Sequence, residues 1–108
     1  LGWGAGSGEA SSPLKALLHT YDKSKGLGAA NRGRHSDAEV DKLIQKALAT
    51  VDSDARGKLL AEATEKAVGE NFGVIPVHYQ VNTWASKKGY KYIPRTDERT
   101  IVMGLKKN

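Results

Sequence analysis

The sequence of 108 residues contains no cysteine and a single methionine, Met103. Without cysteine, the chain can form no disulfide bond, no thiolate metal site and no cysteine nucleophile. Long hydrophobic runs are also missing, because no apolar stretch approaches the roughly 20 residues that a membrane-spanning helix needs. We therefore expect no membrane span in this chain. The lack of cysteine is compatible with a periplasmic location.

Motifs for catalysis and metal binding are missing as well. The histidines His19, His35 and His78 share no ligand spacing such as HxH or HExxH, and we expect His78 to be hydrogen-bonded within a sheet. No serine stands in a GxSxG elbow, and the string GAGSGEA has neither a GK[ST] ending nor the GxGxxG spacing of a nucleotide site. The adjacent Asp97 and Glu98 are expected to be solvated. We predict a protein that is not an enzyme and has no catalytic residue, metal or cofactor.

Positive charge is in excess, with 17 Lys and Arg against 12 Asp and Glu and a net charge of +5. Such a balance raises the question of a polyanionic partner. The basic residues are dispersed, and no predicted helix carries a basic stripe with interleaved aromatics. We therefore expect a solvated basic surface and no nucleic-acid partner. The alternative is a stand-alone α+β module that binds nucleic acid or another polyanion through Lys87, Lys88, Lys91, Arg95 and Arg99.

Capping residues and hydrophobic spacing predict three helices. Ser12 followed by Pro13 predicts the N-cap and first position of a short helix. Ser36 and Glu39 have the spacing of a capping box, and apolar residues then recur on one helical face up to Leu48. Asp52 is predicted to cap the third helix. The residues expected in the core between the two longer helices are Leu43, Ile44, Leu59, Leu60 and Ala63.

The remaining segments have the composition of strands. Leu1 to Ala5 is predicted to end a strand. The run from Val74 to Ala85 is rich in the β-branched and aromatic residues of a strand, and Pro76 implies that this strand is at a sheet edge or joins the sheet late, near that residue. Tyr90 to Ile93 and Thr100 to Leu105 are predicted as two short strands after a turn. Together these elements predict the α+β class, with two main helices and a short helix packed on a small mixed sheet.

Four stretches of this sequence resemble one known family when taken in order. They are GWGA at residues 2–5, HSDAEVDKLI at 35–44, ALATVDSDAR at 47–56, and the run from Val74 through Gly89 and Tyr90. This order and spacing resemble the C-terminal part of a bacterial extracellular solute-binding protein of the peptide/nickel ABC-importer family (family 5). The resemblance covers nearly the whole chain. It implies that the chain is part of a longer protein.

The resemblance also implies an organisation in two parts. Residues 1–80 would be a fragment of the C-terminal lobe of a periplasmic-binding-protein-like fold. Residues 81–108 would be a crossing segment and C-terminal hairpin that pack on the missing first lobe. Two outcomes are open for this tail when the first lobe is missing, either fraying or folding back as a hairpin, and we expect fraying beyond about Arg95.

Candidate solute-binding residues follow from the resemblance. The backbone of Gly4, Ala5 and Gly6 would bond a solute's main chain as an added strand does, and Trp3 would supply an apolar wall with a polar N–H. The loop residues Asn31 and Arg34, or Arg32 in place of Arg34, complete the set, with the arginine facing an anionic group. The other interpretations are that Trp3 is a core residue at a strand end and that the arginines are solvated.

One departure from the family concerns the carboxylate that pairs with a peptide's ammonium group in many such receptors. This chain has Gly6 where that aspartate is expected, and Glu9 follows three residues later. Either Glu9 replaces the aspartate, or the solute is a sugar, an opine or another molecule that is not a peptide. A lost charge-assisted contact weakens affinity by about 1.5 to 3 kcal/mol.

The function implied is the substrate-binding component of an ABC importer. It would capture a peptide or another small solute and deliver it to the permease subunits. The implied location is periplasmic or extracytoplasmic, with a lipid anchor on the full-length protein. A small hydrolase is a third class, and no nucleophile motif supports it.

Overall fold

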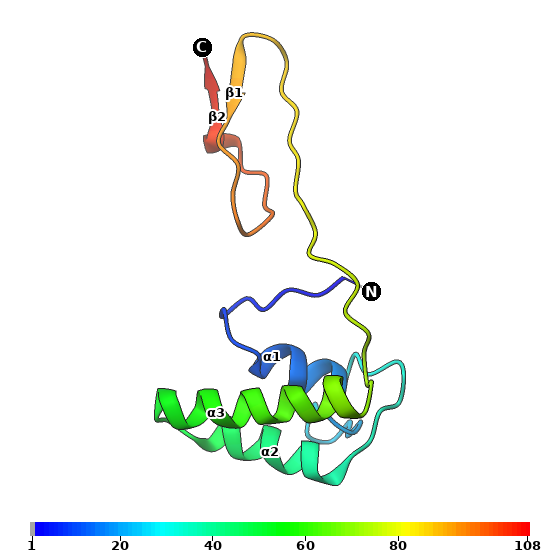
Figure 1. The fold of residues 1–108 in the computed structure, drawn as a ribbon. Coiled ribbons are helices and arrows are strands. Elements are labelled where there is room, and N and C mark those ends of the chain that lie inside the picture. Colours follow the sequence, from blue (N-terminus) through cyan, green and yellow to red (C-terminus); the bar gives the residue numbers. More distant parts are fainter. Residues whose placement is uncertain (1) are drawn as a thin grey trace. The chain divides into compact units, whose positions relative to one another are not determined.

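The computed structural model describes residues 2–108, which divide into two compact units, Leu1–Pro76 and Val77–Asn108. The predicted boundary, between residues 80 and 81, lies four residues further along the chain. Unit 1 holds the helices, with α2 and α3 side by side and the short α1 beside them, and unit 2 holds the strands (Figure 1). Among residues 2–108, no helix combines the length and apolar character needed to cross a membrane.

Helix α2 spans Ala38–Ala49 and is capped by Asp37. The Asp37 carboxylate accepts hydrogen bonds from the amides of Glu39 and Val40 at 2.8 and 3.0 Å. The prediction that Ser36 caps this helix was therefore wrong by one residue. Its hydroxyl bonds to the Thr20 hydroxyl instead, at 2.9 Å. A carboxylate is the stronger cap here because it also meets the positive end of the helix dipole.

Helix α3 spans Ser53–Thr64 and continues as a π-helical segment, η2, over Glu65–Glu70. Asp52 accepts a hydrogen bond from the Ala55 amide at 2.8 Å, which confirms the predicted cap. The Lys66 ammonium forms an ion pair with Glu39 of α2 and a longer one, at 3.9 Å, with Glu70. This pairing joins the two long helices at one end.

The short helix α1, Ser11–Pro13, runs into the π-helical segment η1, Leu14–Leu18. Its N-cap is Ala10, which makes no side-chain cap bond, so the prediction that Ser12 caps this helix was wrong. The start is held instead by Glu9, whose carboxylate accepts from the Ser11 hydroxyl. Leu14 and Leu18 are buried and carry η1 into the core.

The hydrophobic core of unit 1 lies between η1, α2, α3 and η2. Val40, Ile44, Ala47, Ala63 and Ala67 are fully enclosed. Small alanines at the facing positions let the helix backbones approach closely, as ridges-into-grooves packing requires. Of the five predicted core residues, Ile44, Leu60 and Ala63 are buried, whereas Leu43 and Leu59 are partly buried against the cluster.

Unit 2 contains an antiparallel hairpin of β1, Tyr90–Tyr92, and β2, Leu105–Lys107. The register pairs Tyr90 with Lys107, Lys91 with Lys106 and Tyr92 with Leu105. The strand predicted over residues 100–105 begins late because Val102–Gly104 forms a 3-10 turn, η3. The tail thus folds back as a hairpin, where fraying was expected.

Aromatic side chains hold this hairpin to the chain around it. The Trp84 and Tyr92 rings lie 6.0 Å apart, and the Trp84 indole N–H donates to the Thr100 hydroxyl at 3.2 Å. The Tyr92 hydroxyl donates to the Arg99 carbonyl and accepts from the Ile101 amide. These contacts order the loop between the strands.

The α+β class is confirmed, but the predicted mixed sheet was wrong. Within residues 2–108 the only sheet has two antiparallel strands, and it belongs to unit 2. Residues 2–5 form no strand, and Leu1 lies outside the described residues. The run from Val74 to Ala85 forms no strand either, because no neighbouring strand offers it hydrogen bonds, and it continues as extended chain (Figure 1). His78 lies exposed in this run and is not the sheet histidine that was predicted.

Candidate functional site

The N-terminal segment holds four of the predicted site residues, and all four are exposed. Trp3 is 47% exposed, so its side chain is not the core residue of the competing interpretation. A methyl group added at Gly4 or Gly6 would meet nothing within 4 Å, so the space beside each of these two glycines is open. The Ala5 carbonyl accepts from the Gly8 amide at 3.0 Å. This turn leaves the Gly4 and Gly6 backbone groups available to a ligand.

Glu9 is held within the fold. Its carboxylate accepts from the Arg56 guanidinium at two points, Nε at 2.9 Å and Nη2 at 2.5 Å, and from the Ser11 hydroxyl. The hydrogen bonds from Arg56, and then from Ser11, hold the pKa of this carboxyl below its ordinary value. Because its oxygens already have these partners, Glu9 is a poor substitute for an aspartate that binds a solute ammonium group.

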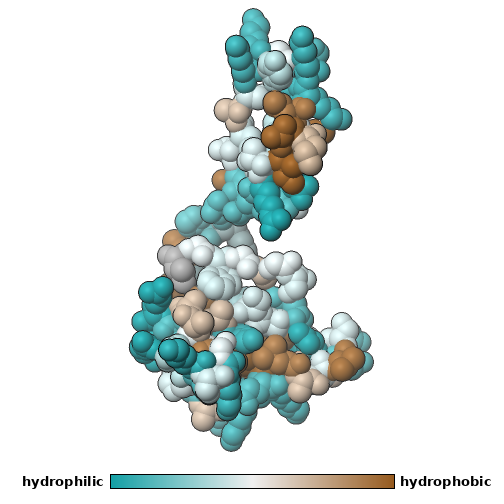
Figure 2. All heavy atoms as spheres, turned by 180° about the vertical axis from the view of Figure 1, so that it is seen from behind, coloured by the Kyte–Doolittle hydropathy of each residue, from teal (hydrophilic) through white to brown (hydrophobic). Residues whose placement is uncertain are grey.

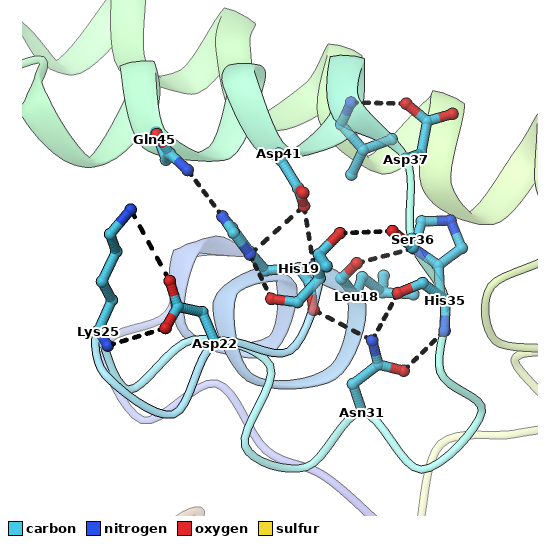
Figure 3. Close-up of polar contacts among 12 residues, drawn as sticks. Leu18, His19, Asp22, Lys25, Asn31, His35, Ser36, Asp37, Asp41 and Gln45 are labelled. Carbon is cyan, nitrogen blue, oxygen red and sulfur yellow. Dashed lines mark hydrogen bonds and ion pairs between the residues drawn. The ribbon is translucent and has the colours of Figure 1, made fainter.

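Asn31 is buried, and its side-chain amide bonds to three backbone groups on two residues, His19 and His35 (Figure 3). The Nδ2 group donates to the carbonyls of His19 and His35 at 3.0 and 2.7 Å, and Oδ1 accepts from the His35 amide at 3.0 Å. Both donors and one acceptor site are thereby used. The side chain fixes the loop and is not positioned to bind a solute.

His19 is buried beside Asn31 and has a partner at each ring nitrogen. Its Nδ1 lies 2.7 Å from the Thr20 carbonyl, to which only an N–H can donate, and 3.4 Å from Asp41. Its Nε2 is 3.0 Å from the Gln45 amide nitrogen and therefore accepts that hydrogen bond (Figure 3). The ring is a structural link between η1 and α2.

His35 likewise places Nδ1 2.7 Å from the Leu18 carbonyl, while Nε2 is buried without a partner. The Nδ1 contact requires an N–H at that nitrogen, so Nε2 carries the lone pair. Residues 2–108 contain no group of three side chains that would hold a metal ion.

Arg34 is exposed and lies in the same loop as Asn31. Its guanidinium carbon stands 4.9 Å from the centre of the Tyr21 ring, a cation–π distance. Its backbone adopts a φ of 56°, which is uncommon for a residue with a side chain. Within residues 2–108, no hydrogen bond, ion pair or aromatic contact joins Arg34 or Asn31 to residues 2–6. The structure therefore does not bring all six predicted site residues into one cluster.

A groove in unit 2 was not predicted from the sequence. It has a volume of about 450 Å³ and is lined by Asn82, Thr83, Trp84, Ser86, Tyr90, Lys91, Tyr92, Pro94 and Asn108. Three aromatic rings and one lysine line a single concave surface. Trp84, Tyr90 and Tyr92 lie close together in the sequence, on either side of a glycine turn, and this clustering could have indicated the groove. That all three rings line one surface depends on the strand register, which the sequence does not show.

Charge is distributed unequally between the units. Residues 1–76 contain ten basic and ten acidic residues, whereas residues 77–108 contain seven basic and two acidic ones. The whole net charge of +5 thus lies in unit 2. Arg95 forms an ion pair with Asp97 at 2.5 Å, and this contact first of all lowers the pKa of Asp97 to about 2. Asp97 and Glu98 are exposed to solvent, as predicted, and Asp97 is also paired with Arg95.

A scan of protein-family models, a search of curated proteins and a search of solved structures gave no match to this chain. The family suggested by the sequence motifs accordingly stays a prediction.

Proposed function

We propose that this chain is the C-terminal region of the substrate-binding component of an ABC importer, which captures a small solute outside the cytoplasm. The support comes from the ordered motifs of the sequence and from one structural feature, the segment Ile75–Val81. The proposal assigns the chain a binding role without catalysis or a cofactor.

The apolar segment carries this proposal. Ile75, Val77, Tyr79 and Val81 alternate with more polar residues, and their side chains are between 78% and 99% exposed. No backbone amide between Ile75 and Lys87 donates a hydrogen bond within residues 2–108. A period of two with apolar residues on one face is the pattern of a strand that covers a core. Since exposed apolar side chains in such a pattern often mark an interaction site, we infer that the rest of a receptor supplies a sheet to which this segment adds a strand.

The solute site in this proposal is built on the N-terminal segment. The exposed Trp3 ring supplies an apolar wall, and the open backbone of Gly4 and Gly6 offers hydrogen-bonding groups. Arg34 is the candidate for an anionic group on the solute. Asn31 is not part of the proposed site, because its side-chain amide is hydrogen-bonded to the backbone of His19 and His35.

Glu9 narrows the class of solute. Its carboxylate is bound to Arg56 and Ser11, and Gly6 stands where the family has an aspartate. A free ammonium group would therefore meet no available carboxylate in this segment. The proposal favours a solute without a free amine over a peptide with a free N-terminus.

Transport would use closure of two lobes around the solute. A cleft between lobes needs both walls, so the 108-residue chain alone is expected to bind solutes weakly or not at all. Hinge closure then creates the surface that the permease recognises.

The test uses the complete protein encoded by the gene and a library of sugars, opines and peptides in titration calorimetry. Trp3→Ala is expected to weaken binding of the identified solute at least tenfold. The matched control is Phe72→Ala, which removes another exposed aromatic ring. Micromolar binding by the 108-residue chain alone, or an unchanged affinity in Trp3→Ala, would contradict the proposed site.

A further inference from the structure

We propose that the hairpin of unit 2 docks on an anionic phospholipid surface through its lysine end. The lysine end comprises five lysines that lie in the turn before β1 and on the paired strands, away from the loop that joins β1 to β2. They are Lys87, Lys88, Lys91, Lys106 and Lys107. This inference rests on the proposed function in one respect, because the receptor of a membrane permease works beside a bilayer. It requires the lysine end to stay outside the packing on a first lobe that the resemblance implies for residues 81–108.

The lysine end accounts for the net charge of the whole chain. The other basic residues of unit 2, Arg95 and Arg99, are balanced by Asp97 and Glu98 in the loop between the strands. None of the five lysines forms an ion pair within residues 2–108. All five are exposed. The hairpin therefore presents five positive charges to solvent with no acidic side chain bound to them.

The register places two of these charges directly opposite each other. Lys91 pairs with Lys106 across the strands, and like charges in that position destabilise a hairpin. Such a repulsion is poorly tolerated in a two-stranded ribbon, which is only marginally stable in water. An anionic partner would remove the repulsion.

Exposed apolar side chains on η3 and β2 of the same unit favour a bilayer over a nucleic acid. Val102 and Met103 are 82% and 84% exposed, and Leu105 shares a strand face with Lys107. Figure 2 shows the hydrophobic spheres of unit 2 next to the hydrophilic spheres at the end of the hairpin. Single-stranded nucleic acid is bound through aromatic stacking and basic groups, and aliphatic side chains provide neither of these contacts.

The aromatic residues agree with the same partner. Tyr90 lies opposite Lys107, and Trp84 packs beside Tyr92 in the groove of unit 2. Tyrosine and tryptophan are enriched at membrane interfaces, where one end of the ring is apolar and the other is hydrated. A hairpin with lysines, aromatic rings and short aliphatic side chains matches the headgroup region of an anionic bilayer.

Vesicle co-sedimentation with the full 108-residue chain tests this proposal. The vesicles contain phosphatidylcholine alone or phosphatidylcholine with phosphatidylglycerol. We expect binding only to the anionic vesicles, with a marked loss between 50 and 500 mM salt because the attraction is screened. The double variant Lys106→Ala/Lys107→Ala should weaken partitioning by about 25-fold, since each lysine near such a surface contributes about fivefold.

The matched control is Lys42→Ala/Lys46→Ala, which removes two exposed lysines from α2 and should leave partitioning within about twofold. Equal binding to both vesicle types, or equal weakening in the two double variants, would overturn the proposal. Binding of a single-stranded oligonucleotide without binding of anionic vesicles would overturn it as well. Because no solute is present, this assay fails or succeeds independently of the solute-binding test.

Discussion

The carboxylate of Glu9 is bound by the guanidinium of Arg56 through two hydrogen bonds across 47 residues of sequence. This pair ties the chain before α1 to the first turn of α3. It therefore fixes where the glycine-rich N-terminal segment leaves the helical unit. The proposed solute site depends on this anchor, although neither residue is part of the site.

The Glu9 pair predicts a dependence of stability on pH. Because Arg56 and Ser11 lower the pKa of Glu9 in the folded state, its stabilising contribution is present above the unfolded value of about 4.3. That contribution is lost as the pH falls through the lowered folded-state pKa. The difference in thermal midpoint between the wild type and Glu9→Gln should be largest near neutrality and shrink toward pH 3. Glu62→Gln, on the exposed side of α3, is the control, and a difference as large at pH 3 as near neutrality would contradict the lowered pKa of Glu9.

The cap of α2 predicts opposite results for two neighbouring residues. Asp37→Ala should lower the midpoint of chemical denaturation because the amides of Glu39 and Val40 lose their acceptor. Ser36→Ala should change it much less, since the Ser36 hydroxyl contacts only Thr20. Urea titrations followed by circular dichroism would measure both, and the reverse order would restore the capping box predicted from the sequence.

Asn31 is expected to act through stability. Asn31→Ala removes three hydrogen bonds from a buried position and leaves the His19 carbonyl without the Asn31 donor. We expect a loss of at least about 2 kcal/mol in the free energy of unfolding. Arg32→Ala, in the same loop and exposed, should have an effect below about 0.5 kcal/mol. Similar values for the two variants would mean that the Asn31 bonds do not stabilise the loop.

The apolar faces of the long helices predict a contrast between two leucines. Leu60 is buried in the core, so Leu60→Ala should lower the free energy of unfolding by about 2 to 5 kcal/mol. Leu48, predicted on the same apolar face as Ile44, is 37% exposed, and Leu48→Ala should cost less than about 1 kcal/mol. A change below about 1 kcal/mol for Leu60→Ala would show that this face is not packed.

Local signals in the sequence predicted that the three helices exist, but they misplaced the caps of α1 and α2. The helical spacing of apolar residues predicted Ile44, Leu60 and Ala63 in the core, and this is confirmed. The predicted cap at Asp52 is also confirmed, because this cap depends only on residues nearby in the sequence. The capping of α2 was misassigned because Ser36 and Asp37 are both good caps. Their choice depends on Thr20, which is distant in sequence and binds the Ser36 hydroxyl.

Pairings between distant residues could not be predicted from the sequence. Composition identifies Val74 to Ala85 as strand-like, but a strand forms only when another strand supplies its hydrogen bonds. The ion pair of Glu9 with Arg56 and the amide contacts of Asn31 also join residues that only the fold brings together. The excess of basic residues after residue 76 is present in the sequence. The pairing of Lys91 with Lys106 depends on the strand register, which the sequence does not specify.

The proposed function depends on residues 75–87 being an extended segment that becomes a strand only in the longer receptor, and amide hydrogen exchange measures this. In the 108-residue chain, we expect these amides to exchange at nearly the rate of an unstructured peptide, since none donates a hydrogen bond within the described residues. In the longer receptor that the proposed function requires, the same amides should be protected at least a hundredfold. Protection in the 108-residue chain equal to that of Ile44, or fast exchange in the longer receptor, would refute the proposed role of this segment.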